Sequence, residues 1–259
     1  MNKISNIDLH KGDCLEVMDE LIAKGVVVDA IITDPPYGTT ACKWDSVIPF
    51  DAMWEQLNRI IKPNGAIVLF GSEPFSSALR MSNIKNYKYD WVWNKTRPTG
   101  NLNAKRMPMK SHEIISVFNC KGFYFPQKTQ APKHLIDNRK TVNNSKVKSG
   151  GAFNNSKAYV NIRTRDNGTR YPLSVQVFKN PNNKTQHPTQ KPVPLMEYLI
   201  KTYTNENETV LDFTMGSGST GVAAKNLNRS FIGIEQDPNY FNIAEERINK
   251  QDLFTLDTK

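Results

Sequence analysis

The chain has 259 residues, of which 38% are hydrophobic and 10% aromatic, and its formal net charge is +9. That length can bury a sizeable core, and the composition is that of an ordinary globular protein. No apolar run approaches the roughly 18 residues of a membrane helix, and the N-terminus lacks the apolar stretch of a secretory signal. We therefore expect a soluble cytoplasmic protein with no membrane partner.

The N-terminal part of the chain alternates strand and helix patterns. Period-2 and continuous apolar runs indicate strands, and apolar residues at helical spacing indicate helices. The expected elements are a strand over 7–10, a helix over 15–23, a strand over 26–33, a helix over 50–61, a turn over 62–65, and strands over 66–70, 87–93 and 114–118. This pattern is βαβ-like.

The middle of the chain carries the positive charge. Residues 119–191 hold 14 lysines and arginines against two acids, a net +12, whereas the rest of the chain has a net −3. A merely solvated surface would explain such a run, but aromatic, hydroxyl and amide side chains interleave with the charges. That mixture favours nucleic acid as the partner. Asparagine and glycine dominate 138–168, which we expect to be a long loop-rich insertion.

Regular patterns return toward the C-terminus. They predict a strand within 171–178, a helix over 191–203, a strand over 209–213, a helix over 220–227, a strand over 230–235 and a helix over 239–249. Two consecutive strand-helix steps indicate a doubly wound α/β fold.

Cysteine and histidine positions argue against a disulfide framework and against a metal site. The three cysteines lack CxxC spacing, and the four histidines are far apart with no HxxxH pair. We expect incidental thiols and no metal.

The stretch LDFTMGSGSTG contains GxGxxG through Gly216, Gly218 and Gly221, between a predicted strand and a predicted helix. Glycine lets a backbone approach a ligand closely, and Glu235, which closes the next strand, can accept from ribose hydroxyls. No Lys-Ser or Lys-Thr follows, so this is not a P-loop. A nucleoside-containing cofactor is expected, and NAD or FAD is the usual choice.

Residues before this turn point to a different cofactor. The acid Asp212 suits an ammonium group and the ring of Phe213 suits an adenine, and both groups occur in S-adenosylmethionine. Asp13, which follows the first predicted strand, offers another acceptor.

The stretch IITDPPYG ends a buried strand on a carboxylate and then stiffens the chain. Each proline fixes φ near −65° and removes a backbone donor, so the segment presents a rigid set of acceptors. A plain strand-terminating turn is the alternative.

Three motifs, DPPY at 34–37, DFTMGSGSTG at 212–221 and HPTQKP at 187–192, resemble those of amino-group DNA methyltransferases. Because the catalytic motif precedes the cofactor motif, the chain is similar to the β class of that family. The resemblance implies a circularly permuted Rossmann-like sheet of seven strands, one of them antiparallel, with a loop-rich target-recognition insertion. The implied parts are a catalytic half over 1–118, a target-recognition insertion over 119–185 and a cofactor-binding half over 186–259.

The resemblance also implies a reaction, methyl transfer from S-adenosyl-L-methionine to adenine N6 in DNA. The Asp34 carboxylate and the Pro35 carbonyl would accept the N–H groups of the amine, which stabilises charge developing on nitrogen. Tyr37 would stack on a base flipped out of the duplex. No Pro-Cys dipeptide is present, so methylation of cytosine carbon-5 is not expected.

The site residues expected on this basis fall into three groups. Catalytic residues are Asp34, Pro35, Pro36 and Tyr37. Cofactor-binding residues are Asp13, Asp212, Phe213, Gly216, Ser217, Gly218, Thr220, Glu235, Thr189 and Lys191, although HPTQKP also reads as a helix start. Nucleic-acid-binding residues are Trp44, for which core packing is the alternative, and Lys95, Arg97, Asn101, Asn103, Lys105, Arg106, Lys110, Arg163 and Arg165.

Other functions remain as alternatives. Cytosine-N4 methylation uses the same geometry, and DPPY rather than SPPY favours adenine. RNA methylation, a catalytically dead DNA-binding module and a nicotinamide oxidoreductase are further candidates, the last leaving DPPY and the basic segment unexplained. DNA is the expected partner, and the family implies a second copy of the chain and a restriction endonuclease as further ones.

Overall fold

The structure is a computed structural model that describes residues 6–39, 45–122, 124–132, 168–180 and 190–250. The chain divides into two compact units. One comprises residues 1–126 and 173–259, and the other comprises residues 127–172. The larger unit contains the sheet and all the helices that the structure describes.

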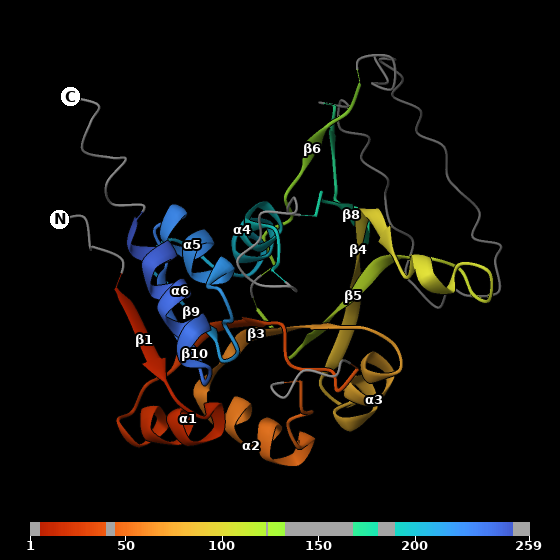
Figure 1. The fold of residues 1–259 in the computed structure, drawn as a ribbon. Coiled ribbons are helices and arrows are strands. Elements are labelled where there is room, and N and C mark those ends of the chain that lie inside the picture. The colour runs from red at the N-terminus through yellow and green to blue at the C-terminus, as the bar shows by residue number, and fades with distance from the viewer. Residues whose placement is uncertain (1–5, 40–44, 123, 133–167, 181–189, 251–259) are drawn as a thin grey trace. The chain divides into compact units, whose positions relative to one another are not determined.

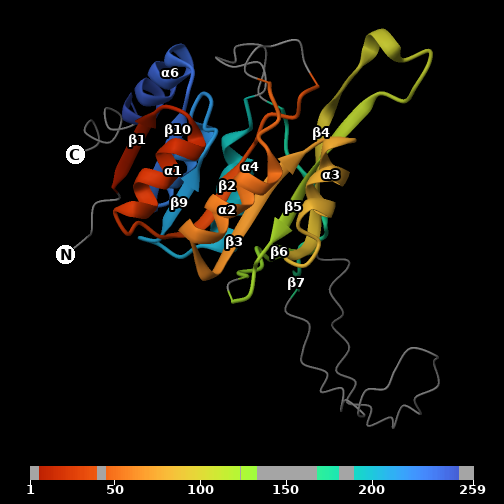
Figure 2. The same cartoon turned by 90° about the horizontal axis from the view of Figure 1, so that it is seen from below.

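An eight-stranded sheet forms the centre of the larger unit, in the order β1-β10-β9-β2-β3-β5-β4-β8. Figure 2 shows this order from β1 to β4. Its strands are β1 (Ile7–Lys11), β2 (Val28–Thr33), β3 (Ile61–Gly71), β4 (Tyr87–Thr99), β5 (Lys110–Phe118), β8 (Val175–Val177), β9 (Thr209–Asp212) and β10 (Ser230–Glu235). β5 is antiparallel to both of its neighbours, β3 and β4, and every other pair in the sheet is parallel. The doubly wound α/β class is confirmed.

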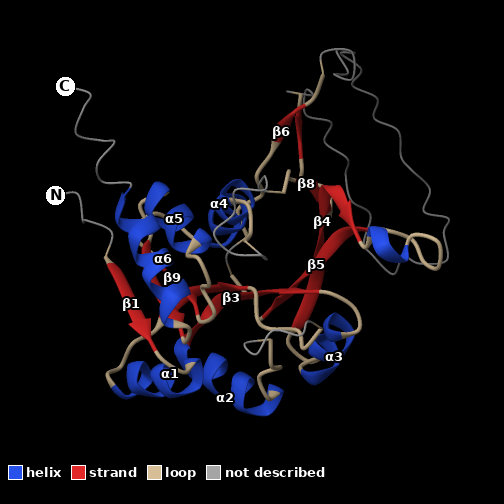
Figure 3. Cartoon of the chain, in the orientation of Figure 1, coloured by secondary structure: helices blue, strands red, loops and turns tan. Residues whose placement is uncertain are grey.

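Helices cover both faces of this sheet (Figure 1, Figure 3). The helices α1 (Cys14–Ala23), α2 (Phe50–Ile60) and α3 (Phe75–Ser82) cover one face, and α4 (Val193–Tyr203), α5 (Ser219–Asn226) and α6 (Pro238–Asn249) cover the other. Successive side chains of a strand point to opposite faces of the sheet. Ile31 therefore packs in the core under α1, α2 and α3, and Ile32 packs in the core under α4, α5 and α6. The strands are therefore almost continuously apolar, as in a sheet buried on both sides.

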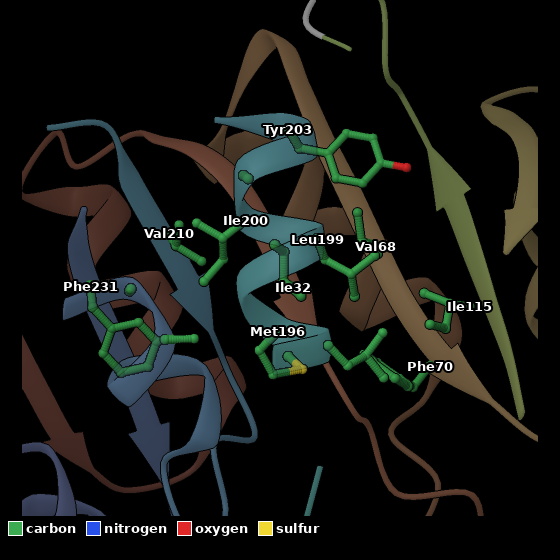
Figure 4. Close-up of a cluster of buried hydrophobic side chains, with 14 of the residues drawn as sticks. Ile32, Val68, Phe70, Ile115, Met196, Leu199, Ile200, Tyr203, Val210 and Phe231 are labelled. Carbon is green, nitrogen blue, oxygen red and sulfur yellow. The ribbon is translucent and has the colours of Figure 1, made fainter. Parts of the chain in front are cut away.

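Helix α4 packs directly on the centre of the sheet (Figure 4). Its residues Met196, Leu199 and Ile200 are at most 1% exposed and lie against Ile32 and Val68 of β2 and β3. This packing fixes the start of α4, and with it the residues that precede the helix, at one end of the central strands.

Three features of the fold differ from the expectations. The sheet has eight strands rather than seven, because the short β8 pairs with β4. The turn expected at 62–65 lies within β3, where the register with β2 shifts between Val28 and Ala30. The chain also forms α3, which no pattern predicted.

The end of β4, the start of β5 and the residues that connect them form an extended arm (Figure 2). Both strands are longer than predicted, and the short 3-10 helix η1 (Asn101–Asn103) lies between them. Leu102 on η1 is fully exposed.

The smaller unit is described only in part. Its strands β6 (Thr129–Gln130) and β7 (Thr169–Arg170) pair in antiparallel fashion. Within it, the Lys128 ammonium lies 4.4 Å from the ring centroid of Tyr171. The predicted insertion, 119–185, is wider than this unit, and its role in target recognition stays a prediction.

The part of the chain that the structure describes has no membrane-spanning helix and no metal-binding cluster. None of the helices there is long and apolar enough to cross a bilayer. In the same ranges, no group of three or more His, Cys, Asp or Glu side chains is placed to hold a metal ion.

Candidate active site

The DPPY stretch and the glycine turn lie side by side, although they are far apart in the sequence. DPPY follows β2 and the glycine turn follows β9, and these two strands are parallel neighbours. From β2 the chain crosses to β3 on one side, whereas from β9 it crosses to β10 on the other. The carboxyl ends of strands at such a switch point form a crevice in which ligands bind.

A cavity of about 390 Å³ occupies this position. It is lined by residues of the DPPY loop, the glycine turn, the end of β10, the start of α1 and the segment before α4. Of the predicted site residues, the lining includes Asp13, Asp34, Pro35, Pro36, Tyr37, Lys191, Asp212, Phe213, Gly216, Ser217, Thr220 and Glu235. The fold thus brings most of the predicted catalytic and cofactor-binding residues together.

The loop after β2 is held in shape by a buried carboxylate. Asp45, which is 8% exposed, accepts the backbone N–H of Tyr37 at 2.8 Å and that of Gly38 at 2.9 Å on Oδ1, and that of Thr39 at 2.9 Å on Oδ2. Gly38 has a φ of 68°, which lets the chain turn back without strain. The loop conformation therefore depends on Asp45, which the sequence did not single out.

Asp34 is bonded on both of its carboxylate oxygens. The Tyr37 hydroxyl donates to Oδ1, and the Lys191 ammonium donates to Oδ2 at 2.6 Å. The Tyr37 ring in turn lies against Phe75 of α3, with ring centroids 5.0 Å apart. A carboxylate has about four lone-pair sites, so Asp34 keeps accepting capacity toward the cavity.

The environment of Asp34 shifts the pKa of three side chains. Burial raises the pKa of the Asp34 carboxyl, and the Lys191 ammonium opposes that rise. Burial, with Asp34 nearby, also raises the pKa of the Tyr37 hydroxyl well above its ordinary value. For Lys191, burial favours the neutral amine, but Asp34 and Glu113 outweigh it and raise the pKa of the ammonium. Tyr37 is thus a donor and Lys191 a cation at neutral pH.

Asp212 ties the end of β9 to the end of β2. Its carboxylate accepts from the Thr33 hydroxyl at 2.5 Å, from the Thr220 hydroxyl at 2.5 Å and from the backbone N–H of Thr214 at 3.2 Å. The Thr214 hydroxyl also donates to the backbone carbonyl of Asp34 at 3.2 Å. Asp212 is 4% exposed, so it organises the crevice besides lining it.

Replacing Asp212 by asparagine is expected to change how stability depends on pH. Burial raises the pKa of Asp212 from 3.8 to about 6, so between these values the folded chain binds a proton that the unfolded chain has released. The contribution of Asp212 to the free energy of unfolding therefore falls as pH rises from 4 to 6, by up to about 3 kcal/mol. Urea unfolding at four pH values from 4 to 7 measures the difference between wild type and Asp212→Asn. A difference that stays constant across this range would contradict the expectation.

The glycine turn serves packing as well as ligand approach. Gly216 and Gly218 have positive φ values of 52° and 76°. A Cβ on Gly218 would lie 3.0 Å from the Cβ of Ala244 on α6, and one on Gly221 would collide with Ile248 and Phe231. Two of the three glycines therefore allow α5 to lie close to its neighbours.

The carboxyl end of β10 and the first turn of α5 complete the crevice. Glu235 accepts the backbone N–H of Gly216 at 2.9 Å and that of Asp237 at 2.8 Å, and burial raises its pKa. Arg247 donates to the backbone carbonyl and, at 2.9 Å, to the hydroxyl of Ser217. Ser219 lines the cavity, and its buried hydroxyl has no hydrogen-bond partner within the described ranges.

Two predicted cofactor contacts have structural roles in addition. Asp13 is the N-cap of α1, where its carboxylate accepts the backbone N–H groups of Leu15 at 2.8 Å and Glu16 at 3.3 Å. Phe213 is 1% exposed and belongs to the core under α1 and α2. Both residues still line the cavity.

The expectation that Lys95 contacts a phosphate is wrong. This side chain is buried, and its ammonium lies 3.2 Å from the Glu113 carboxylate. The run of basic residues from 95 to 110 suggested a surface segment, but its first member is an interior residue of β4. The other predicted contacts on the arm are exposed or partly exposed: Arg97, Asn101, Asn103, Lys105, Arg106 and Lys110.

Four predicted site residues lie outside the described residues: Trp44, Arg163, Arg165 and Thr189. Conversely, the structure adds residues that the sequence analysis missed, namely Thr33, Asp45, Glu113, Thr214 and Ser219. Thr33 precedes DPPY, and Thr214 and Ser219 lie within the motif at 212–221, so the motifs themselves were an available signal. For Glu113 the available signal was weaker: it is an acid at the start of a buried strand.

Comparison with known proteins gives a consistent result. The family model described as DNA methylase matches residues 28–246. M2.LlaDCHI of Lactococcus lactis subsp. cremoris, a type II methyltransferase, is 28% identical over 277 residues, covering 97% of this chain and 92% of the relative.

Solved structures resemble this chain over nearly its whole length. The M1.HpyAVI-SAM complex is 29% identical, with a TM-score of 0.63, and the match covers 94% of this chain and 99% of that one. The cytosine-N4-specific PvuII DNA methyltransferase has a TM-score of 0.62 at 16% identity, covering 95% of this chain and 87% of that one. This second likeness is one of fold alone.

Proposed function

This chain belongs to the N6/N4 DNA methylase family, and from that premise we propose that it methylates the exocyclic N6 amino group of adenine in DNA. It is a DNA methyltransferase that uses S-adenosyl-L-methionine. The choice of base, the residues that act and the DNA surface are our proposals.

The observation that carries the proposal is the position of Asp34. Its carboxylate lines the same cavity as the glycine turn and Glu235, at the carboxyl ends of adjacent parallel strands. An acceptor for the amine and a pocket for a nucleoside cofactor are therefore in one crevice, which is the arrangement that direct transfer between them needs.

Asp34 and Pro35 are proposed to activate the amine. An adenine amino group is a poor nucleophile because its lone pair is delocalised into the ring. Hydrogen bonds from its two N–H groups to the Asp34 carboxylate and the Pro35 carbonyl stabilise the positive charge that develops on nitrogen. The amine loses one proton on methylation, and Asp34, whose pKa burial raises, is the acceptor placed to take it.

Tyr37 is proposed to hold the flipped base. A base inside a duplex cannot reach this cavity, so it leaves the stack at a cost of a few kcal/mol, and aromatic stacking offsets part of that cost. The Tyr37 ring is fixed at its hydroxyl by Asp34 and on its ring by Phe75.

The residues of the crevice fit S-adenosyl-L-methionine, which supplies the methyl group when bound. The Ser219 hydroxyl, which has no hydrogen-bond partner among the described residues, is a polar group in need of a ligand, and Glu235 keeps lone pairs for ribose hydroxyls. We propose these two with Asp13, Asp212 and Gly216 as cofactor-binding residues. The Lys191 ammonium lines the cavity and is bonded to Asp34, and its predicted contact with the cofactor carboxylate stays a prediction.

The proposed reaction is tested by incubating the protein with DNA and S-adenosyl-L-methionine carrying a labelled methyl group, then identifying the labelled nucleoside. N6-methyladenine is expected. Label in N4-methylcytosine would overturn the base assignment, and label in RNA but not DNA would overturn the substrate class. A companion restriction endonuclease and a homodimer stay predictions.

The arm between β4 and β5 is proposed to contact the DNA backbone. The double variant Lys105→Gln/Arg106→Gln is expected to bind duplex DNA about tenfold more weakly, because two exposed cations of the arm are lost. The slope of log affinity against log salt should decrease in magnitude by about 2, since each phosphate contact contributes about 0.9. Fluorescence anisotropy at several NaCl concentrations measures both quantities.

The matched control is Lys24→Gln/Lys250→Gln, which removes two exposed charges at the ends of α1 and α6. Equal losses in both double variants would show that only net charge matters, against a specific role of the arm.

A further inference from the structure

Four charged side chains of alternating sign form a buried row that ends at Asp34. The Lys95 ammonium lies 3.2 Å from Glu113 Oε1, and the Lys191 ammonium lies 3.1 Å from Glu113 Oε2 and 2.6 Å from Asp34 Oδ2. The members come from four places in the chain: Lys95 from β4, Glu113 from β5, Lys191 from the segment before α4, and Asp34 from the loop after β2.

Removing these four charges from water costs free energy unless each of them has a partner. The side chains of Lys95 and Lys191 are 7% and 8% exposed, and those of Glu113 and Asp34 are 15% and 20% exposed. Ions removed from water need partners, and two cations with two anions leave the row neutral. Asp34 and Lys191 line the cavity, whereas Glu113 and Lys95 do not. The inner pair, Glu113 and Lys95, therefore acts on the cavity through Lys191.

The ammonium of Lys191 is held between two carboxylates and over aromatic rings. Phe70 lies beneath it at 5.1 Å from ring centroid to Nζ, and Trp93 at 6.0 Å. The ammonium donates a hydrogen bond to Asp34, whereas its contact with Glu113 Oε2 is an ion pair, and that oxygen has no hydrogen-bond partner among the described residues. Without Glu113, the ammonium would be free to approach Asp34 alone and to neutralise it more fully.

We propose that Lys191 and Glu113 are positioning residues that set the charge of Asp34, Lys191 by keeping it ionised and Glu113 by sharing the ammonium so that Asp34 still accepts from the substrate amine. The part of this inference that concerns the amine rests on the proposed function. The electrostatic coupling itself does not.

The charged and titratable groups that face Asp34 determine in which direction each neighbour shifts its pKa. From its own loop Tyr37 donates to it, and from the end of β9 Asp212 lies close enough to interact electrostatically. Lys191 lowers the pKa of the Asp34 carboxyl, and Glu113 raises it. Removing Lys191 and removing Glu113 should therefore move the titration of Asp34 in opposite directions.

The test is a carbon-13 NMR titration of the side-chain carboxyl of Asp34 in the full-length protein, assigned by the signal lost in Asp34→Asn. We expect the midpoint in Lys191→Met to rise by about 1–3 pH units, the usual effect of losing an opposite charge at this distance. In Glu113→Gln the midpoint should fall. In parallel, the acid limb of kcat should move the same way in each variant, with the plateau of Glu113→Gln about tenfold lower.

The matched control is Asp90→Asn, which removes a carboxylate from β4 that pairs with Arg80 and Ser116 instead. It should leave the midpoint and kcat unchanged. A Glu113→Gln midpoint that stays at the wild-type value or rises would overturn the proposal, and that variant decides even if Lys191→Met fails to fold. The titration needs neither DNA nor turnover, so a wild type that methylates nothing would overturn the proposed function and leave the coupling to be decided by NMR.

Discussion

Replacing Asp34 by asparagine is expected to lower the rate of methyl transfer by about 10²–10³, the usual loss when one preorganised group that stabilises developing charge is removed. The amide is nearly isosteric with the carboxylate, but it carries no charge and turns one acceptor into a donor. The amide cannot take up the proton that the amine loses. The Lys191 ammonium keeps Glu113 as its partner, so the fold should persist.

The measurement is single-turnover methylation under saturating DNA and cofactor, with binding of each ligand measured separately. Affinities for DNA and S-adenosyl-L-methionine should stay within a few-fold of wild type. The same chemical change at the surface, Asp19→Asn in the exposed pair with Arg59, serves as the control and should leave the rate unchanged. Asp34→Asn turnover within tenfold of wild type would refute the assigned role.

The second large effect is expected at Asp45, which holds the loop after β2 in shape. In Asp45→Ala three backbone N–H groups of the loop lose their acceptor, and each lost hydrogen bond at this partly exposed loop costs about 0.5–1.5 kcal/mol. The loop would then no longer hold Tyr37 and Asp34 in one geometry. A misplacement of about 1 Å can lower a rate by about 10², so we expect a loss of that size in kcat.

A graded series separates loop geometry from charge. Asp45→Asn keeps one oxygen, which can still accept from Tyr37 and Gly38, but its amide faces the N–H of Thr39. The expected order of kcat is wild type, then Asp45→Asn, then Asp45→Ala. If Asp45→Ala turns over at the wild-type rate, the loop does not depend on this carboxylate.

Most of the elements were predictable because their signals are local. The helices α1, α2, α4, α5 and α6 begin and end within about two residues of their predicted bounds, since apolar spacing marks each buried face. Two elements differ from the prediction: α3, which is only eight residues long, was missed, and the expected turn at 62–65 is part of β3, between the pairs that Ile61 and Ala66 form with β2.

Much of the candidate site was also visible in short motifs. Asp34, Tyr37, Asp212, Glu235 and Lys191 all line the cavity. Asp34, Asp212 and Glu235 were singled out from the residues around them, and Tyr37 and Lys191 through the resemblance of their motifs to those of DNA methyltransferases. Their residue types indicate the chemistry of the site, and their positions at or near strand ends indicate where in the fold it lies.

The sequence by itself thus determined which segments form strands and helices and which residue types stand at the strand ends, because a side-chain pattern of period 2 or 3.6 depends only on near neighbours. Only the tertiary structure decided which of those ends meet. Lys191 reaches Asp34 across 157 positions of sequence, and Lys95 becomes an interior ion because Glu113 stands on the adjoining strand. Such contacts follow from strand order, which long-range pairing sets, and no local pattern encodes it.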